Sequence, residues 1–454
     1  MARSREIIND LTVGSVPRKL LTFALPFMLS TLLQTAYGMV DMMVVGQVVG
    51  SSGLSAVSIS TRVIWMTTAL CMGFTNAGQI LIAQLVGAGK KAELQKCIGT
   101  LILTVFCAAV FITVFGLSLT KPILRLLRTP AESFPGAVSY LHITFIGTVF
   151  TFGYNLVAAM FRGMGDSKHP LIFVAVSASV NLVLDILAVA VLGMGVAGAA
   201  LATITGQGVS LVVSVVYLYR SRDRFGFDFR RESFRFDGDN LRKLIRLGIP
   251  FALQNAAISI SMLFVNRFVN SYGVTASATF GTGTRIEEFP WIIINGILVA
   301  TATMVGQNMG AGKPERMKKC VSVGVLVCGI TAAVVVFLFL CFPRQIYSLF
   351  TSDADVLELC PKFMLALACS IPATSLMGPY TAFIQGIGNA KLTLIIALLD
   401  GFVSRIAISL ILAYGFGLGL MGWFFGYGMA AYVNTAISMV YYYGGFWKKR
   451  TALV

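Results

Sequence analysis

Residues 25–43 read LPFMLSTLLQTAYGMVDMM, an apolar helix with a proline near its start and one carboxylate near its end. Gln34, Tyr37 and Asp41 follow one another at intervals of three and four residues, so they share one helix face. An ionisable side chain is costly inside such a segment, and it usually faces a bundle interior and marks a pathway. The alternative is that Asp41 lies at the helix end and simply reaches the membrane interface.

Composition places the chain in a membrane. Of its 454 residues, 57% are hydrophobic and only 12% are charged, whereas a soluble domain carries about 25% charged residues. The mean hydropathy is +0.82. The net charge of +16 invites a nucleic-acid interpretation, but the positions of the basic residues favour membrane topology, so we expect no nucleic-acid partner. The 8 cysteines form no CxxC motif and the 2 histidines lie far apart, so neither a disulfide framework nor a metal site is indicated.

The hydropathy pattern predicts an all-α polytopic protein with twelve transmembrane helices, each near the roughly 20 residues that a bilayer requires. The predicted spans are Lys19–Val45, Ser55–Leu85, Cys97–Thr120, Ala137–Phe161, Pro170–Leu192, Gly198–Tyr219, Leu244–Asn270, Ala278–Val305, Cys320–Phe342, Pro361–Gln385, Leu392–Tyr414 and Met421–Tyr443.

The basic residues predict the orientation. With the N-terminus in the cytoplasm, 26 lysines and arginines fall in the inner segments and 5 in the outer loops. This bias predicts that both termini are cytoplasmic in a multi-pass protein of the cell membrane. The polar and basic N-terminal stretch, which includes Arg3 and Arg5, lacks the apolar core of a signal peptide.

The chain repeats itself at an offset of about 223 residues. Gly87-Ala88-Gly89-Lys90 recurs as Gly310-Ala311-Gly312-Lys313. Six spans per repeat is an even number, so the halves enter the membrane in the same direction as a parallel repeat, with a site at the repeat interface. We predict an N-lobe at residues 1–219, a cytoplasmic linker at 220–240 and a C-lobe at 241–454. The arginine-rich linker either contacts anionic lipid headgroups or is a solvated positive-inside segment.

A second carboxylate lies in the fifth span. Ser177, Asn181 and Asp185 are spaced four residues apart and form one polar stripe. Interhelical hydrogen bonding explains Ser177 well and Asn181 in part, but it explains a carboxylate poorly. Counted from the outer ends of their spans, Asp41 and Asp185 lie at nearly the same depth.

Tyr140 and Thr203, early in their inward-running spans, reach the same height, so these residues are expected to line one chamber. Two carboxylates close together in a low-dielectric cavity cannot both ionise cheaply, so one should hold a proton near neutral pH. That predicts a proton-coupling site or, with further oxygens, a sodium site.

These features resemble the multidrug and toxic compound extrusion (MATE) family over nearly the whole chain. The resemblance is carried by the two parallel halves, the first helix with Val40-Asp41-Met42-Met43, the turn Phe161-Arg162-Gly163-Met164-Gly165-Asp166, and Asn181-Leu182-Val183-Leu184-Asp185. It implies that Asp41, Asn181 and Asp185 form the cation site of the N-lobe. By similarity, the residues that support the site or line the drug cavity are Gln34, Tyr37, Tyr140, Asn155 and Thr203.

The sequence departs from the NorM-like branch of that family. Sodium-driven relatives there carry a glutamate in the seventh helix and an aspartate in the tenth, whereas the seventh span here reads FALQNA and the tenth PATSL. The chain is therefore more similar to the DinF-like branch. Proton coupling is favoured, sodium stays open, and no cofactor is expected apart from the transported ion.

The second half holds other charges, among them Arg285, Glu287, Glu288, Asp400 and Arg405. Arg285 and Glu288 are spaced for pairing on one helix face. The group is either a structural ion network that neutralises its own members or a second coupling site. Pro26 is either a hinge that bends with protonation or a static kink.

Three functions are compatible with these observations. The first is a cation-coupled antiporter, expected to be a monomer, that exports amphipathic and often cationic drugs through a cavity whose methionines suit varied ligands. The second is a lipid-linked oligosaccharide flippase of related fold, which would favour a cationic cavity for its diphosphate. The third is an intramembrane enzyme, against which stand the absent metal-ligand cluster, Ser/His pair and DDxxD-type motif.

Overall fold

The computed structural model describes residues 9–454, so Arg3 and Arg5, which contribute to the predicted charge bias, lie outside the described residues. All regular secondary structure of the described chain is helical, and no strand occurs between residues 9 and 454. Its first half comprises α1 (Val16–Val48), α2 (Ser51–Ala88), α3 (Lys91–Leu126), α4 (Phe134–Ile146), α5 (Thr148–Gly163), α6 (Lys168–Asp185), the π-helix η1 (Ile186–Val191), α7 (Gly195–Arg220), α8 (Arg222–Phe225) and η2 (Arg231–Ser233).

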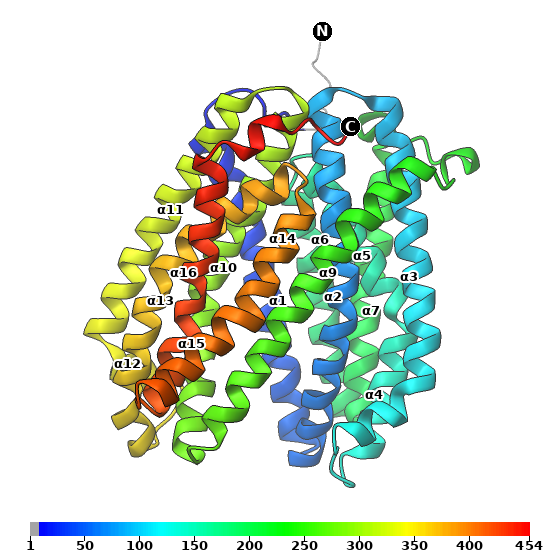
Figure 1. Cartoon of the computed structure of the whole chain (residues 1–454). Helices are drawn as coiled ribbons and strands as arrows, with labels where there is room; N and C mark the ends of the chain where they lie inside the picture. Colours follow the sequence, from blue (N-terminus) through cyan, green and yellow to red (C-terminus); the bar gives the residue numbers. More distant parts are fainter. Residues whose placement is uncertain (1–8) are drawn as a thin grey trace. The chain divides into compact units, whose positions relative to one another are not determined.

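The second half repeats the pattern of long apolar helices (Figure 1). It comprises α9 (Gly238–Asn270), α10 (Val274–Gly310), α11 (Pro314–Cys341), α12 (Pro343–Ser348), α13 (Ala354–Gly386), α14 (Ala390–Leu398), the π-helix η3 (Leu399–Arg405), α15 (Ile406–Leu410), the π-helix η4 (Ile411–Gly415), α16 (Leu420–Tyr443) and η5 (Phe446–Lys449).

Every one of the twelve predicted spans is helical. Among the described residues, 10 helices are long and apolar enough to cross a membrane, and 11 if α4 and α5 count as one span. The twelfth predicted span is α16, which is helical but is not among these candidate spans. The all-α polytopic fold predicted from the sequence is therefore confirmed.

The fourth predicted span is not one straight helix. α4 and α5 meet at a 50° bend, and the residue between them is Gly147. A Cβ atom at Gly147 would lie 2.4 Å from Cγ2 of Ile204 in α7. The missing side chain therefore allows α7 to approach the bend closely.

By packing, the chain divides into two compact units. Of the described residues, unit 1 holds 9–10 and 25–252, and unit 2 holds 11–24 and 253–454. Both α1 and α9 pass from one unit to the other, close to Pro26 and Pro250. The predicted lobe boundaries at residues 219 and 241 stay a prediction.

Hydrogen bonds explain why the start of α1 belongs to unit 2. Arg316 donates to the backbone carbonyls of Leu11, Val13 and Gly14 at 3.1, 2.8 and 2.7 Å. The Nζ atom of Lys313 donates to the carbonyl of Thr12 at 3.0 Å. These cationic donors fasten the segment that precedes α1 to the beginning of α11.

The linker packs on α3 within unit 1. Thr100 Oγ1 donates to the carbonyl of Arg235 at 3.3 Å and accepts from the backbone N–H of Asp237 at 3.0 Å. A Cβ atom at Gly99 would lie 1.9 Å from the carbonyl oxygen of Ser233. The linker backbone therefore packs directly on α3 at a position where any side chain larger than that of glycine would clash.

Each unit has its own apolar core. In unit 1 the core lies among α1, α2, α3, α4, η1 and α7 and includes Val45, Phe145 and Val189. In unit 2 it is more aromatic and gathers Phe280, Phe363, Trp423 and other side chains of α10, α13 and α16. These cores hold the helices that carry the polar side chains described next.

Candidate cation sites

The two carboxylates predicted to act together lie together in unit 1. Asp41, in the last third of α1, is 7% exposed, and Asp185, the last residue of α6, is 1% exposed. The two carboxyl groups interact electrostatically. Oδ1 of Asp41 and both oxygens of Asp185 have no hydrogen-bond partner among the described residues. The pair therefore offers acceptors without donors, an arrangement that a proton or a small cation would satisfy.

The backbone changes form at this carboxylate. α6 ends at Asp185, and the π-helix η1 continues the same span from Ile186 to Val191. π-Helical turns are rare and are frequent at functional sites. The sequence pattern had predicted a single regular helix for this span.

Three further predicted residues surround the pair. Asn181, one turn before Asp185, is 2% exposed, and its Nδ2 lies 3.5 Å from Oγ1 of Thr203 in α7. Tyr140 of α4 is buried and interacts with both carboxyl groups as well as with Thr203. The structure therefore brings together Asp41, Asn181, Asp185, Tyr140 and Thr203, while their role in transport stays a prediction.

Of the remaining predicted residues of this half, only Tyr37 has a described interaction with the pair. Tyr37 is half-buried and interacts with Asp41 and Gln207. Gln34 is exposed. Asn155 donates to the carbonyl of Thr151, one turn earlier in its own helix, at 2.8 Å, so no described contact links it to the carboxylates.

Pro26 lies within α1, which is continuous from Val16 to Val48. Because proline has no N–H, the helix lacks one backbone hydrogen bond at this point. Ser30 Oγ donates to the carbonyl of Pro26 at 2.9 Å. The predicted choice between a moving hinge and a static kink stays open.

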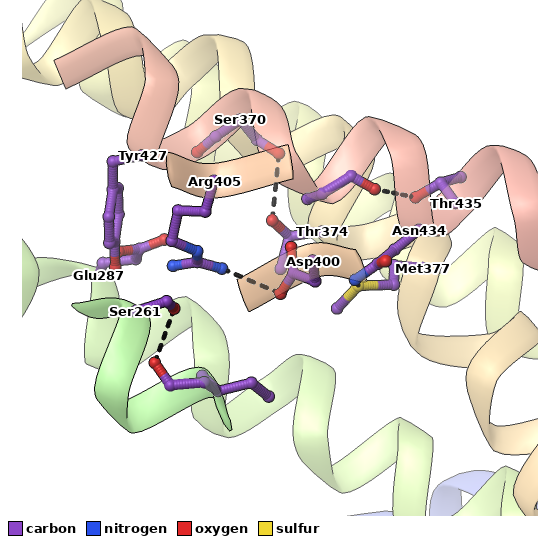
Figure 2. Close-up of polar contacts among 12 residues, drawn as sticks. Ser261, Glu287, Ser370, Thr374, Met377, Asp400, Arg405, Tyr427, Asn434 and Thr435 are labelled. Carbon is purple, nitrogen blue, oxygen red and sulfur yellow. Dashed lines mark hydrogen bonds and ion pairs between the residues drawn. The ribbon is translucent and has the colours of Figure 1, made fainter. Parts of the chain in front are cut away.

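The five charged residues that the sequence singled out in the second half fall into two separate groups. Arg285 and Glu288 are 3.7 Å apart with side chains 59% and 47% exposed. The buried group joins Arg405 to Asp400 at 3.2 Å and also contains Glu287 (Figure 2). The spacing that predicted the Arg285–Glu288 pair is correct, but this pair lies outside the buried group.

Sequence reasoning missed three polar residues. Tyr427 of α16 donates to Glu287 at 2.8 Å, and its ring lies 5.1 Å from the Arg405 guanidinium carbon. Asn434, two turns further along α16, is 4% exposed. Gln207, one turn after Thr203 in α7, accepts from Thr151. Thr203 and Gln207 are four residues apart, and Tyr427 and Asn434 are seven apart. Such spacing of polar residues on an apolar helix would have indicated a shared polar face.

Among the described residues, no group of three or more histidine, cysteine or acidic side chains is placed to hold a metal ion. The candidate sites consist of one or two carboxylates with neighbouring amide and hydroxyl groups.

One family model matches the chain twice, at residues 26–187 and 250–411, and its description is MatE. The chain belongs to the MatE family. The two matches confirm the internal repeat, and they begin at Pro26 and Pro250, the two residues near which α1 and α9 change units.

Relatives of this MatE protein are similar over nearly their whole length. The probable multidrug resistance protein YoeA of Bacillus subtilis (strain 168) is 28% identical over 442 residues, which cover 96% of this chain and 95% of the relative. The probable multidrug resistance protein NorM of Thermotoga maritima is 25% identical over 456 residues, which cover 97% and 95%.

A solved structure shares the fold. The outward-facing conformation of a multidrug resistance MATE family transporter of the MOP superfamily superposes with a TM-score of 0.90 at 23% identity, covering 97% of this chain and 98% of that one. The family and its relatives therefore group this protein with multi-pass membrane transporters. The resemblance inferred from the sequence is confirmed.

Proposed function

We propose that this MatE protein is a cation-driven antiporter that exports amphipathic, often cationic small molecules across the cell membrane. The relatives named as multidrug resistance proteins support the export of drugs. The single observation that carries the coupling mechanism is the buried pair Asp41 and Asp185, which has acceptor oxygens and no donor.

The physical basis of coupling is competition for one negative charge. A proton on the pair removes a buried charge, which weakens the binding of a cationic drug nearby. The drug in turn opposes protonation, since linkage between two ligands is reciprocal. One charge moved across 100 mV is worth about 2.3 kcal/mol, which is enough to drive export against a gradient. We favour the proton as the coupling ion, with sodium as the alternative, and we place both termini in the cytoplasm.

Transport in inverted membrane vesicles tests the proposal. Export of a cationic dye into the vesicles is driven first by a proton gradient and then by a sodium gradient, and the ion that supports transport is the coupling ion. We expect Asp41→Asn, which keeps the volume and removes the charge, to reach the membrane at the parental level, to abolish transport and to remove the pH dependence of dye binding. Asp185→Asn should have the same effect.

Asp239→Asn is the matched control, because Asp239 is an exposed aspartate of the linker end. The control should transport at the parental rate. Parental transport by Asp41→Asn would refute coupling at this pair, and transport without either ion gradient would refute an antiport mechanism.

A further inference from the structure

A surface recess lies beside the first turns of α9, in the part of this helix that belongs to unit 1. It has a volume of about 550 Å³, which is within the range of cavities that hold small ligands. We call it the α9 recess, and its lining residues are Gly238, Leu241, Arg242, Ile245 and Arg246. None of these residues belongs to the candidate sites described above, so the recess is a separate feature of the molecule.

Two guanidinium groups give the α9 recess its positive charge. Arg242 and Arg246 are one turn apart on the same face of α9, and both side chains are exposed. No hydrogen bond or ion pair joins either guanidinium to another residue that the structure describes. Among the described residues, no acidic side chain lines the recess. Two neighbouring cations without a counter-charge attract an anion.

A phosphate group is the anion that suits this arrangement best. A guanidinium presents its N–H donors in a planar fork that matches the oxygens of a phosphate. It offers no acceptor, so the ammonium group of a zwitterionic lipid headgroup would find no partner in the recess. The recess therefore favours a phosphate that carries a net negative charge.

The length of α9 places the recess close to the level of lipid headgroups. α9 is a helix of 33 residues and one of the candidate membrane spans. Such a helix is about 50 Å long, which is about 20 Å more than the hydrocarbon core of a bilayer. If both ends share the excess, about seven residues at each end lie in the headgroup region. Arg242 and Arg246 are the fifth and ninth residues of α9, so they flank the boundary between headgroups and hydrocarbon.

Apolar side chains continue from the recess toward the hydrocarbon. Ile245, which lines the recess, and Ile249, one turn further along, are 42% and 45% exposed. They share the face of α9 that carries the two arginines, because the intervals are three and four residues. A free phosphate would use the arginines alone, whereas a phospholipid would also cover this apolar surface with an acyl chain.

We propose that the α9 recess binds one anionic phospholipid, whose phosphate lies between Arg242 and Arg246 and whose acyl chain runs along Ile245 and Ile249. The lipid holds the first turns of α9, the helix that passes into unit 2 after Ala252. Because it binds the folded protein, it also stabilises the fold by mass action.

Native mass spectrometry of the purified full chain in detergent tests the proposal. The protein is titrated with phosphatidylglycerol and, separately, with phosphatidylcholine that has the same acyl chains. We expect one phosphatidylglycerol to bind at least about tenfold more tightly than phosphatidylcholine, because only the first lipid has a net charge opposite to that of the arginines. Glycerol 3-phosphate, which has the phosphate without the acyl chains, should not displace the lipid at equal concentration.

Two pairs of substitutions locate the site. Arg242→Gln with Arg246→Gln removes both guanidinium groups from the recess and should weaken the binding of phosphatidylglycerol about thirtyfold. Arg231→Gln with Arg235→Gln is the matched control, because it removes the same charge from exposed linker residues that do not line the recess. The control should bind the lipid with the parental affinity. All four side chains are exposed, so both variants should keep the parental unfolding midpoint.

Three results would overturn the proposal. The first is equal affinity for phosphatidylglycerol and phosphatidylcholine. The second is equal weakening by the two pairs of substitutions, which would indicate a diffuse attraction to positive charge. The third is displacement of the lipid by glycerol 3-phosphate at equal concentration, which would indicate a site for a free phosphate. Because the measurement detects lipid binding and not transport, its outcome is separate from that of the export assay.

Discussion

Adding one methyl group at Gly206 should disrupt the candidate site of unit 1 from a distance. Gly206 is buried in α7, where a Cβ atom would lie 2.8 Å from the carbonyl oxygen of Ser177 and 3.2 Å from Cβ of Asn181. The first contact is with backbone, which cannot rotate away, so α7 must shift from α6. We expect Gly206→Ala to cost about 1–3 kcal/mol of unfolding free energy, the usual cost of overpacking a core.

Gly208→Ala is the matched control. It lies two residues along the same helix, and its Cβ atom would meet only the ring of Phe150 at 3.6 Å, an ordinary contact. Replacing glycine by alanine favours a helix by about 1 kcal/mol in water. This contribution is common to both variants, so the difference between them isolates the overpacking of α7 on α6.

Two measurements on purified, full-length protein check this prediction. Denaturant titration should place the unfolding midpoint of Gly206→Ala well below that of Gly208→Ala. Dye transport should also fall in Gly206→Ala, because the shift separates Asn181 from Thr203, now 3.5 Å apart. Equal midpoints for the two variants would show that α6 and α7 do not pack as closely as described.

Two further predictions follow from the charges. A membrane-impermeant thiol reagent on intact cells should label Ser51→Cys and spare Lys90→Cys, and the opposite pattern would reverse the orientation inferred from the basic residues. Glu287→Gln should destabilise the protein by about 1–2 kcal/mol more than Glu288→Gln. Glu287 accepts a charge-assisted hydrogen bond from Tyr427 and faces a buried guanidinium, whereas Glu288 lies in a partly exposed pair worth about 0–1 kcal/mol. Equal unfolding midpoints for these variants would contradict the buried network.

Most of the helices could be predicted from hydropathy, since bilayer thickness sets their length. The bend at Gly147 could not, because the side chain that packs against this glycine, Ile204, belongs to a helix more than fifty residues later. The π-helical turns after Asp185 and around Asp400 also leave no mark in the periodicity, since one extra residue in a turn hardly changes an apolar pattern.

The proximity of Asp41 and Asp185 could be predicted from their depth in the membrane, because both lie on spans that run in the same direction. The buried charged group of unit 2 could be predicted only in part. The spacing of three residues predicted an ion pair between Arg285 and Glu288, and this pair forms. Which glutamate lies near Arg405 depends on how α10 packs against other helices, and the sequence does not show this. Tyr427 and Asn434 were missed because tyrosine and asparagine near apolar residues have several ordinary explanations.

The passage of α1 and α9 from one unit to the other has a consequence for fragments of the chain. If the linker were cut, the first fragment would carry Leu11–Ala24, although this segment packs in unit 2. The second fragment would carry the start of α9 up to Ala252, although this segment packs in unit 1. Neither fragment then contains a complete unit, and each supplies the piece that the other lacks. We therefore expect two separately translated halves to associate through these exchanged helix segments, without the covalent linker.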